Sequence, residues 1–266
     1  MSKANKKVSK TTINGNYINI SIEDLDLKKI TFSELRKNKY KGNYFNIYYD
    51  GKIPQVKFPK MKAPFGISRF EDPNNNSKVN YGLETSLDEK LDNSELTDVY
   101  KKCVEFDNFI INNVKKNWKT FEYDDEEPEM KQLKKMYTHM VRPSLGKDKK
   151  PTDYSSRIKS SLNPTKEGVF PISCYDEDKN KIELNTDNYN QIVGQSDEVS
   201  TVKLLRQLWF MSNGGFGTSW DIRQMRVYKN QNNLTDSVLF DTDDEKDSGE
   251  DSESESAKGS EISDEE

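Results

Sequence analysis

Basic and aromatic side chains are interleaved between residues 56 and 70, in the stretch VKFPKMKAPFGISRF. In chain order they are Lys57, Phe58, Lys60, Lys62, Phe65, Arg69 and Phe70. Cations attract nucleic-acid phosphates, and aromatic faces stack on bases with little regard for sequence. The prolines and Gly66 predict a shaped loop here rather than a strand. The stretch therefore predicts a nucleic-acid contact. The alternative is a surface loop anchored by one phenylalanine.

A second candidate surface comes from NYFNIYY, residues 43–49. Successive side chains of a strand point to opposite faces. Phe45, Ile47 and Tyr49 then share one face, and Tyr44 and Tyr48 share the other. If the first face is core, the two tyrosines stand outside it as a platform for stacking. The alternative for either tyrosine is an ordinary position at the rim of the core.

A third candidate is DYSSRIKSSL, residues 153–162, which also has the composition of a strand. The period of two puts Tyr154, Ile158 and Leu162 on one face and leaves Arg157 and Lys159 on the other. We therefore expect an edge at which these two cations follow a phosphate backbone.

The stretch LWFMSNGGFGTSWDIRQMRVY, residues 208–228, has the pattern of a hairpin that ends in the basic residues Arg223 and Arg226. A two-residue turn at Asn213-Gly214 would place Arg206 directly across from Asp221, a favourable pair. A turn at Gly214-Gly215 would shift the pairing. The first register gives two faces, one with Leu205, Trp209, Met211, Phe216, Trp220 and Ile222, the other with Arg206, Leu208, Phe210, Gly217, Ser219 and Asp221.

Residues that could carry catalysis are scarce. His139 is the single histidine, and a lone histidine in a predicted helix is usually a packing or surface residue. The chain has no HExxH, no His/Cys zinc spacing, no GxSxG and no complete P-loop. Residues 176–187 approach calcium-loop spacing, but Lys181 and Asp187 stand where that loop needs glycine and glutamate, so we predict a polar hairpin turn. We expect no catalytic residue, metal or cofactor, although a metal-dependent nuclease stays open.

The charge is unevenly distributed along the 266 residues, whose formal net charge is −5. Residues 241–266 hold 13 acidic residues and two lysines, while residues 1–240 have a net charge of +6 and all 28 aromatic residues. An acidic segment without aromatic residues cannot bury enough apolar surface to fold, so residues 236–266 are predicted to be a disordered tail. Residues 1–10, with four lysines, are predicted to be a flexible basic arm or an ordinary frayed terminus.

Strand-like runs precede and follow one helical segment in residues 11–235, the predicted body. Apolar residues three or four apart predict a long helix over 96–118 and a second over 130–140, with Pro128 in its first turn and Pro143 ending it. This order predicts an α+β fold, an OB-type β-barrel with a helical insertion at about 94–142. A β-sandwich with a helical insertion is the alternative.

Two of these stretches, FPKMKAPFGISRFE and LWFMSNGGFGTSWDIRQMRVY, 35 residues in all, resemble the single-stranded-DNA-binding proteins of nucleocytoplasmic large DNA viruses, of the African swine fever virus and giant-virus type. The resemblance implies an OB-fold body that coats single strands during viral DNA replication, repair or recombination. Lys60, Lys62, Phe65 and Gly66 are the matched motif positions. The acidic tail is not matched. It looks like the tails of cellular and phage strand-coating proteins.

These observations favour a non-enzymatic protein that binds single-stranded DNA without sequence preference, with replication proteins recruited by the acidic tail. The alternatives are an RNA-binding regulator and an acidic-tailed structural or chaperone-like protein. With two cysteines, no signal segment and no apolar run of membrane-spanning length, we expect an intracellular protein of the host cytoplasm or viral factory, not secreted and without a membrane partner. The oligomeric state is not predicted.

Overall fold

The computed structural model describes residues 11–38, 42–72, 75–89, 94–121 and 126–230. The chain divides into two units, Met1–Asn230 and Gln231–Glu266, and all described residues belong to the first. The predicted basic arm, residues 1–10, lies outside the described residues, as does the predicted acidic tail, residues 236–266.

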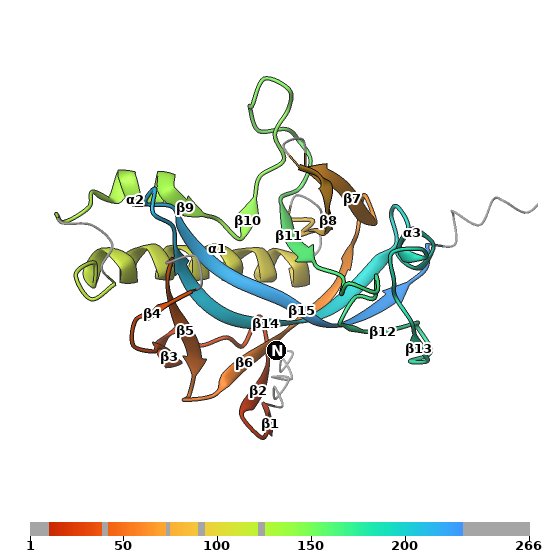
Figure 1. Ribbon diagram of the computed structural model, residues 1–266, viewed down its shortest axis with the longest axis horizontal. Coiled ribbons are helices and arrows are strands. Elements are labelled where there is room, and N and C mark those ends of the chain that lie inside the picture. The colour runs from red at the N-terminus through yellow and green to blue at the C-terminus, as the bar shows by residue number, and fades with distance from the viewer. Residues whose placement is uncertain (1–10, 39–41, 73–74, 90–93, 122–125, 231–266) are drawn as a thin grey trace, which may run out of the picture. The chain divides into compact units, whose positions relative to one another are not determined.

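Most strands belong to one eleven-stranded sheet, whose centre is a long curved hairpin (Figure 1). In pairing order, its main path is β1 Thr12–Asn14, β2 Tyr17–Ser21, β6 Ile53–Lys62, β14 Glu198–Phe210, β15 Phe216–Tyr228, β12 Ser173–Tyr175 and β13 Lys181–Ile182. The strands off this path are β5 Asn43–Tyr49 on β14, β3 Ile30–Phe32 and β4 Arg36–Lys37 on β5, and β9 Tyr137–Thr138 on β15. The predicted polar turn joins β12 to β13, where the Asp176 N–H donates to the Asn180 carbonyl, so that prediction is confirmed.

The β14–β15 hairpin pairs in a register different from the predicted one. Phe210 lies opposite Phe216, because the turn between the strands is longer than two residues and the Met211 N–H donates to the Gly215 carbonyl over 2.7 Å. The rings of Phe210 and Phe216 stack in the core with centroids 5.8 Å apart, while Met211 is exposed. The two predicted faces were therefore wrong at this end of the hairpin.

A bulge in β14 changes the register again further from the turn. Leu208 pairs with Thr218 but Leu205 pairs with Trp220, so Asp221 lies opposite Leu204. Arg206 is therefore not directly across from Asp221, as predicted, but reaches it diagonally over 3.1 Å. The ion pair was predicted from a wrong register.

β6 corrects the prediction of a loop through Pro59. The strand pairs with β14, with Phe58 opposite Thr201 and Met61 opposite Val199, so β6 has one residue more than β14 between these pairs. This bulge contains Pro59, which has no N–H to give to a ladder and is tolerated at such irregular places. Phe58 is fully buried. Only residues 63–66, between β6 and the next strand, have the predicted loop character.

The helix α1, Ser94–Lys116, confirms the predicted long amphipathic helix. Its apolar face packs into the larger core through side chains three or four residues apart, among them Val99, Cys103, Phe106 and Ile110. These side chains cover one face of the large sheet, where Phe106 meets Trp220 of β15 edge to face.

The helix α2, Met130–Met136, is shorter than predicted. After it the chain turns into β9, and backbone N–H groups donate to the buried Asp107 carboxylate instead of continuing the helix. Those groups belong to Met140, at 3.1 Å, and Val141, at 3.3 Å, and the Tyr137 hydroxyl also donates to Asp107, at 2.9 Å. A buried carboxylate from α1 thus competes with the helical hydrogen bonds that periodicity alone favours.

A second, four-stranded sheet runs β10 Val141–Arg142, β11 Arg157–Leu162, β8 Asn75–Ser86 and β7 Ile67–Asp72. β8 buries Tyr81, Leu83 and Thr85. β11 buries Ile158 and Leu162 as predicted. Tyr154, however, is 77% exposed, because the strand begins only at Arg157 and the alternation does not extend back to it.

The fold is mostly β with few helices, and its large sheet is curled, in agreement with the predicted α+β class. α1 and α2 lie between β8 and β9 in the chain, and the other helices within the described ranges are the one-turn η1 Leu27–Lys29 and α3 Tyr189–Ile192. In the described part of the chain, no helix has both the length and the apolar character that crossing a membrane requires.

Candidate nucleic-acid interface

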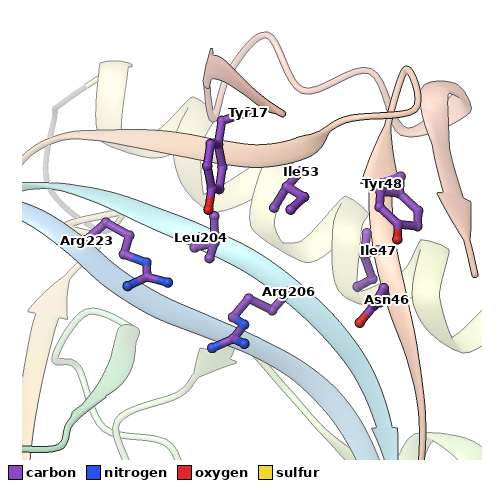
Figure 2. A pocket seen from close by; sticks show the side chains of 8 residues that line it. All are labelled: Tyr17, Asn46, Ile47, Tyr48, Ile53, Leu204, Arg206 and Arg223. Atoms are coloured by element: carbon purple, nitrogen blue, oxygen red, sulfur yellow. The ribbon is translucent and has the colours of Figure 1, made fainter. Parts of the chain in front are cut away.

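A hollow of about 210 Å³ lies on the face of the large sheet opposite α1. It is lined by Tyr17 of β2, Asn46, Ile47 and Tyr48 of β5, Ile53 of β6, Leu204 and Arg206 of β14, and Arg223 of β15. Figure 2 shows the two tyrosine rings separated across the hollow, with the two arginine side chains over the hairpin strands. We call this set of residues the tyrosine–arginine pocket.

The alternation of β5 places Tyr48 at this pocket. Phe45, Ile47 and Tyr49 are buried in the core, while Tyr44 and Tyr48 are half-buried on the opposite face, as predicted. Tyr48 lines the pocket, whereas Tyr44 lies near the beginning of β5, opposite Trp209 of β14. One tyrosine of the predicted platform therefore reaches the pocket and the other extends the same face beyond it.

Tyr17 was missed by the sequence reasoning, although a signal for it exists. Ile18, Ile20 and Ile22 are buried, so alternation predicts that Tyr17 points away from the core, and its side chain is 37% exposed. The parallel pairing of β2 with β6 then sets Tyr17 beside Ile53, at the edge of the pocket. That long-range pairing has no local signal in the sequence.

A bulge in β15 delivers Arg223 to the pocket. Lys203 pairs with Ile222 and Val202 with Gln224, so Arg223 has no residue opposite it in β14. Such an extra residue bends the strand and redirects its side chain. Arg223 is exposed, and among the described residues no carboxylate lies within ion-pair distance of its guanidinium. It is therefore available to an anionic ligand.

Arg206 is the second cation of the pocket, and it was not among the predicted contacts. It forms an ion pair with Asp221 at 3.1 Å, in which both side chains are about half exposed. Exposed ion pairs of this kind contribute only about 0–1 kcal/mol. A phosphate can therefore replace Asp221 as the partner of Arg206 at little cost.

Lys57 extends the basic surface next to the pocket. It pairs with Val202 of β14, two residues before the pocket-lining Leu204, and therefore lies on the same side of the sheet. Lys57 is exposed, and no ion pair joins it to a carboxylate in the part of the chain that the structure describes.

The other predicted cations of β6 and β15 lie towards the far end of the hairpin. Lys60 is paired with Glu198 and sits 4.8 Å from the ring centroid of Tyr228. Lys62 is exposed opposite Glu198. Arg226 donates to the backbone carbonyls of residues 176 and 177, so its guanidinium fastens the β12–β13 turn. These residues do not line the tyrosine–arginine pocket.

The remaining predicted contacts lie in the smaller sheet, except for Phe65, which lies in the loop between β6 and β7. Phe65 is 51% exposed, with the Arg157 guanidinium 5.0 Å from its ring centroid. Arg157 and Lys159 share Glu84, at 3.0 and 3.9 Å, and Arg69 is paired with its neighbour Glu71 at 2.8 Å. The predicted basic loop is therefore divided between two sheets.

Gly66 has a structural reason to be glycine. Its φ is +58°, and a Cβ atom there would overlap the backbone carbonyl oxygen of Val193. Gly66, one of the positions matched in the resemblance, thus lets the turn after β6 pack closely against the backbone that precedes β14. This turn leaves Phe65 at the surface.

Neither cysteine thiol lies in an environment that would make it reactive. Cys103 and Cys174 are both free and buried. Burial raises the pKa of the Cys103 thiol to about 12 and that of Cys174 to about 11, so neither forms a thiolate near neutral pH. In residues that the structure describes, no group of three or more His, Cys, Asp or Glu side chains is arranged to hold a metal ion.

No protein-family model matches the chain, and no curated protein sequence matches it. Among solved structures, the single-stranded DNA-binding protein from bacteriophage Enc34 in complex with ssDNA is similar at 12% identity and a TM-score of 0.40, over 74% of this chain and 96% of that one. Bacteriophage T7 gp2.5, a single-stranded DNA-binding protein, is similar at 9% identity and a TM-score of 0.39, over 73% and 98%. The resemblance to proteins of large DNA viruses stays a prediction.

Proposed function

We propose that this protein binds single-stranded DNA without sequence preference and catalyses no reaction. The observation that carries the proposal is the tyrosine–arginine pocket, in which Tyr17 and Tyr48 stand beside Arg206 and Arg223 on one open face of the sheet. Proteins that hold single strands without reading sequence combine aromatic faces for bases with cations for phosphates.

The pocket favours single strands over duplex for a geometric reason. A tyrosine ring can stack only on a base whose face is free, and the bases of a duplex already stack on each other. Each base stacked on an aromatic side chain contributes about 1–3 kcal/mol. This term is present for a single strand and absent for a duplex, whereas phosphate attraction acts on both.

The cations around the pocket make the binding depend on salt. Arg223 and Lys57 are free of carboxylate partners in the described part of the chain, and Arg206 can exchange Asp221 for a phosphate. For single strands the slope of log affinity against log salt is about −0.7 per phosphate neutralised. Four to six phosphate contacts over the whole basic surface would give a slope of roughly −3 to −4.

Three finer inferences accompany this proposal. The curled sheet and the helices between β8 and β9 support an OB-type arrangement. The resemblance of residues 58–71 and 208–228 supports a role in viral DNA replication, repair or recombination inside the host cell. The net charge of −11 in residues 241–266 supports recruitment of replication proteins that have basic surfaces.

The test is fluorescence anisotropy with a labelled thymidine oligonucleotide, the corresponding duplex and an RNA of equal length. We expect the DNA single strand to bind more tightly than the duplex at equal salt. Tyr48→Ala should weaken single-strand binding about 5- to 150-fold, which corresponds to the loss of one stacked base. Arg223→Ala should flatten the salt slope by about 0.7.

The matched control variants are Tyr154→Ala and Lys150→Ala. Tyr154 is 77% exposed and the Lys150 side chain 81% exposed, and neither lines the pocket. Equal affinity for duplex, or the same loss in the control variants, would refute the proposal. Tighter binding to RNA would redirect it to an RNA-binding regulator.

A further inference from the structure

A second hollow, of about 270 Å³, lies between the edge of β15 and the strands β10 and β11 of the smaller sheet. Among the residues that line it are Arg142, Lys159, Trp209, Thr218, Trp220 and Asp221. We call it the tryptophan pocket. Most of its residues were not among the predicted contacts.

The pairing of β15 explains why this hollow is open. On the edge away from β14, β15 pairs with β9 at Phe216 and Gly217, and with β12 from Gln224 to Arg226. Within the described residues, no strand pairs with that edge between Gly217 and Gln224. The edge therefore presents polar backbone groups to the hollow beside the Thr218 and Ser219 hydroxyls.

The two tryptophans supply flat apolar walls, and both are half-buried. The Trp209 ring lies against Gly217, where an added Cβ atom would come within 2.7 Å of Trp209 Cζ2. The Trp220 indole N–H donates to Thr218 Oγ1 at 3.0 Å, which fixes the orientation of that ring. Both rings are thus held in place before any ligand arrives.

The charge of the tryptophan pocket is positive. Arg142 is exposed, and in the described part of the chain no carboxylate lies within ion-pair distance of it. Lys159 lies 3.9 Å from Glu84, whose other oxygen is held by Arg157 at 3.0 Å. The one carboxylate that lines the hollow, Asp221, is already paired with Arg206. An anion therefore meets two cations with little opposing charge.

The Arg206–Asp221 pair also connects the two hollows. Arg206 lines the tyrosine–arginine pocket and Asp221 lines the tryptophan pocket, and their side chains meet at 3.1 Å. When a phosphate of the bound DNA replaces Asp221 as the partner of Arg206, that phosphate therefore lies at the border of the tryptophan pocket.

We propose that the single strand held at the tyrosine–arginine pocket continues past Arg206 into the tryptophan pocket, where Trp209 stacks on a base and Arg142 and Lys159 bind its phosphate. This inference rests on the proposed function. The tryptophan pocket would bind the nucleotides that follow those at the tyrosine–arginine pocket. The proposal therefore predicts how many nucleotides of DNA one protein molecule contacts.

Oligonucleotide length separates this proposal from the proposed function. Strand-binding sites of this class cover about 4–16 nucleotides, so a thymidine oligonucleotide of about four fits the first pocket alone and one of about twelve reaches the second. Arg142→Gln should leave the affinity for the short one unchanged. It should weaken the long one about 5- to 10-fold and flatten its salt slope by about 0.7. Lys150→Gln, the same kind of charge removal on an exposed side chain, should change neither.

A second measurement reports on the pocket directly. In a Trp118→Phe variant, the two remaining tryptophans, Trp209 and Trp220, both line the tryptophan pocket, and their emission should be quenched by the long oligonucleotide but not by the short one. If Arg142→Gln changes neither affinity and the tryptophan emission is not quenched, while Tyr48→Ala still weakens binding, the second pocket is refuted and the proposed function stands. If Arg142→Gln weakens both lengths equally, the strand does not pass from the first pocket to the second. If Tyr48→Ala has no effect on either length, the proposed function itself fails.

Discussion

Lys203 of β14 points into the larger core and should destabilise the folded protein. The residue is 1% exposed, and its Nζ lies 4.6 Å from the ring centroid of the buried Phe58. Among the described residues, this Nζ has no hydrogen-bond partner. A buried ammonium group that lacks hydrogen bonds loses its hydration without replacement, and the aromatic face compensates only in part.

The size of the effect follows from the pKa of Lys203, which burial lowers from 10.5 to about 8. One pKa unit corresponds to about 1.4 kcal/mol, so keeping this amine charged at pH 7 costs the folded state about 3 kcal/mol. Between pH 8 and 10.5 the unfolded chain holds a proton that the folded chain has released. The unfolding free energy should therefore rise with pH across this window, and the cost should be complete below it.

We expect Lys203→Met, which keeps a long unbranched side chain, to raise the unfolding free energy by about 3 kcal/mol at pH 7 and by much less near pH 10. The assay is guanidinium unfolding followed by tryptophan fluorescence at both pH values. The control is Lys57→Met, the same substitution on the exposed side of the neighbouring strand, which should change stability by less than about 0.5 kcal/mol. A less stable Lys203→Met variant, or a gain that is equal at both pH values, would refute the reasoning.

Four further outcomes are expected. Lys60→Ala and Lys62→Ala should each weaken anisotropy-measured binding for all sequences alike, and each should flatten the salt slope by about 0.7 if the replaced lysine neutralises one phosphate. Phe65→Ala should weaken single-strand binding by about 1–3 kcal/mol without changing the salt slope or, because the ring is 51% exposed, the Tm in a thermal scan. The acidic residues 241–266, with a net charge of −11, should compete with DNA for the basic surface, so deleting them should tighten single-strand binding, most at low salt. If the deletion leaves the affinity unchanged at every salt concentration of a titration, that competition is excluded. Contact with the Asp107 carboxylate raises the pKa of His139, so the unfolding free energy should fall as pH rises through that raised pKa, and His139→Gln should lack this dependence in unfolding curves measured across pH.

The parts of the fold that depend on local periodicity could be predicted from the sequence. The two-residue alternation of β5 correctly assigned Phe45 to the core and Tyr48 to the opposite face, and the helical spacing from residue 96 onwards correctly located α1. In these segments the buried side chains repeat with the period of the element itself, so each segment carries its own signal.

The site depended on features without a local signal. Arg223 reaches its pocket because of a bulge, and Tyr17 because β2 pairs in parallel with a strand more than thirty residues further along the chain. Pro59 favoured a loop on local grounds, but the sheet accommodates it at an irregular position in β6. Local periodicity likewise favoured a longer α2, but the Asp107 carboxylate of α1 accepts backbone hydrogen bonds just after α2 and the helix ends early. Long-range pairing and buried polar groups decided each of these points.

The position of β14 in the middle of the sheet has a consequence for how the chain is made. β6 and β5 both pair with β14, which follows β6 by roughly 140 residues. At about 5–20 residues per second, synthesis of that intervening chain takes on the order of 7–30 s. During this time the N-terminal strands lack their central partner, and their apolar faces and open edges are exposed to other nascent chains. The sheet therefore closes late, through contacts of long sequence separation, which makes slow folding and a need for protection during synthesis properties of this topology.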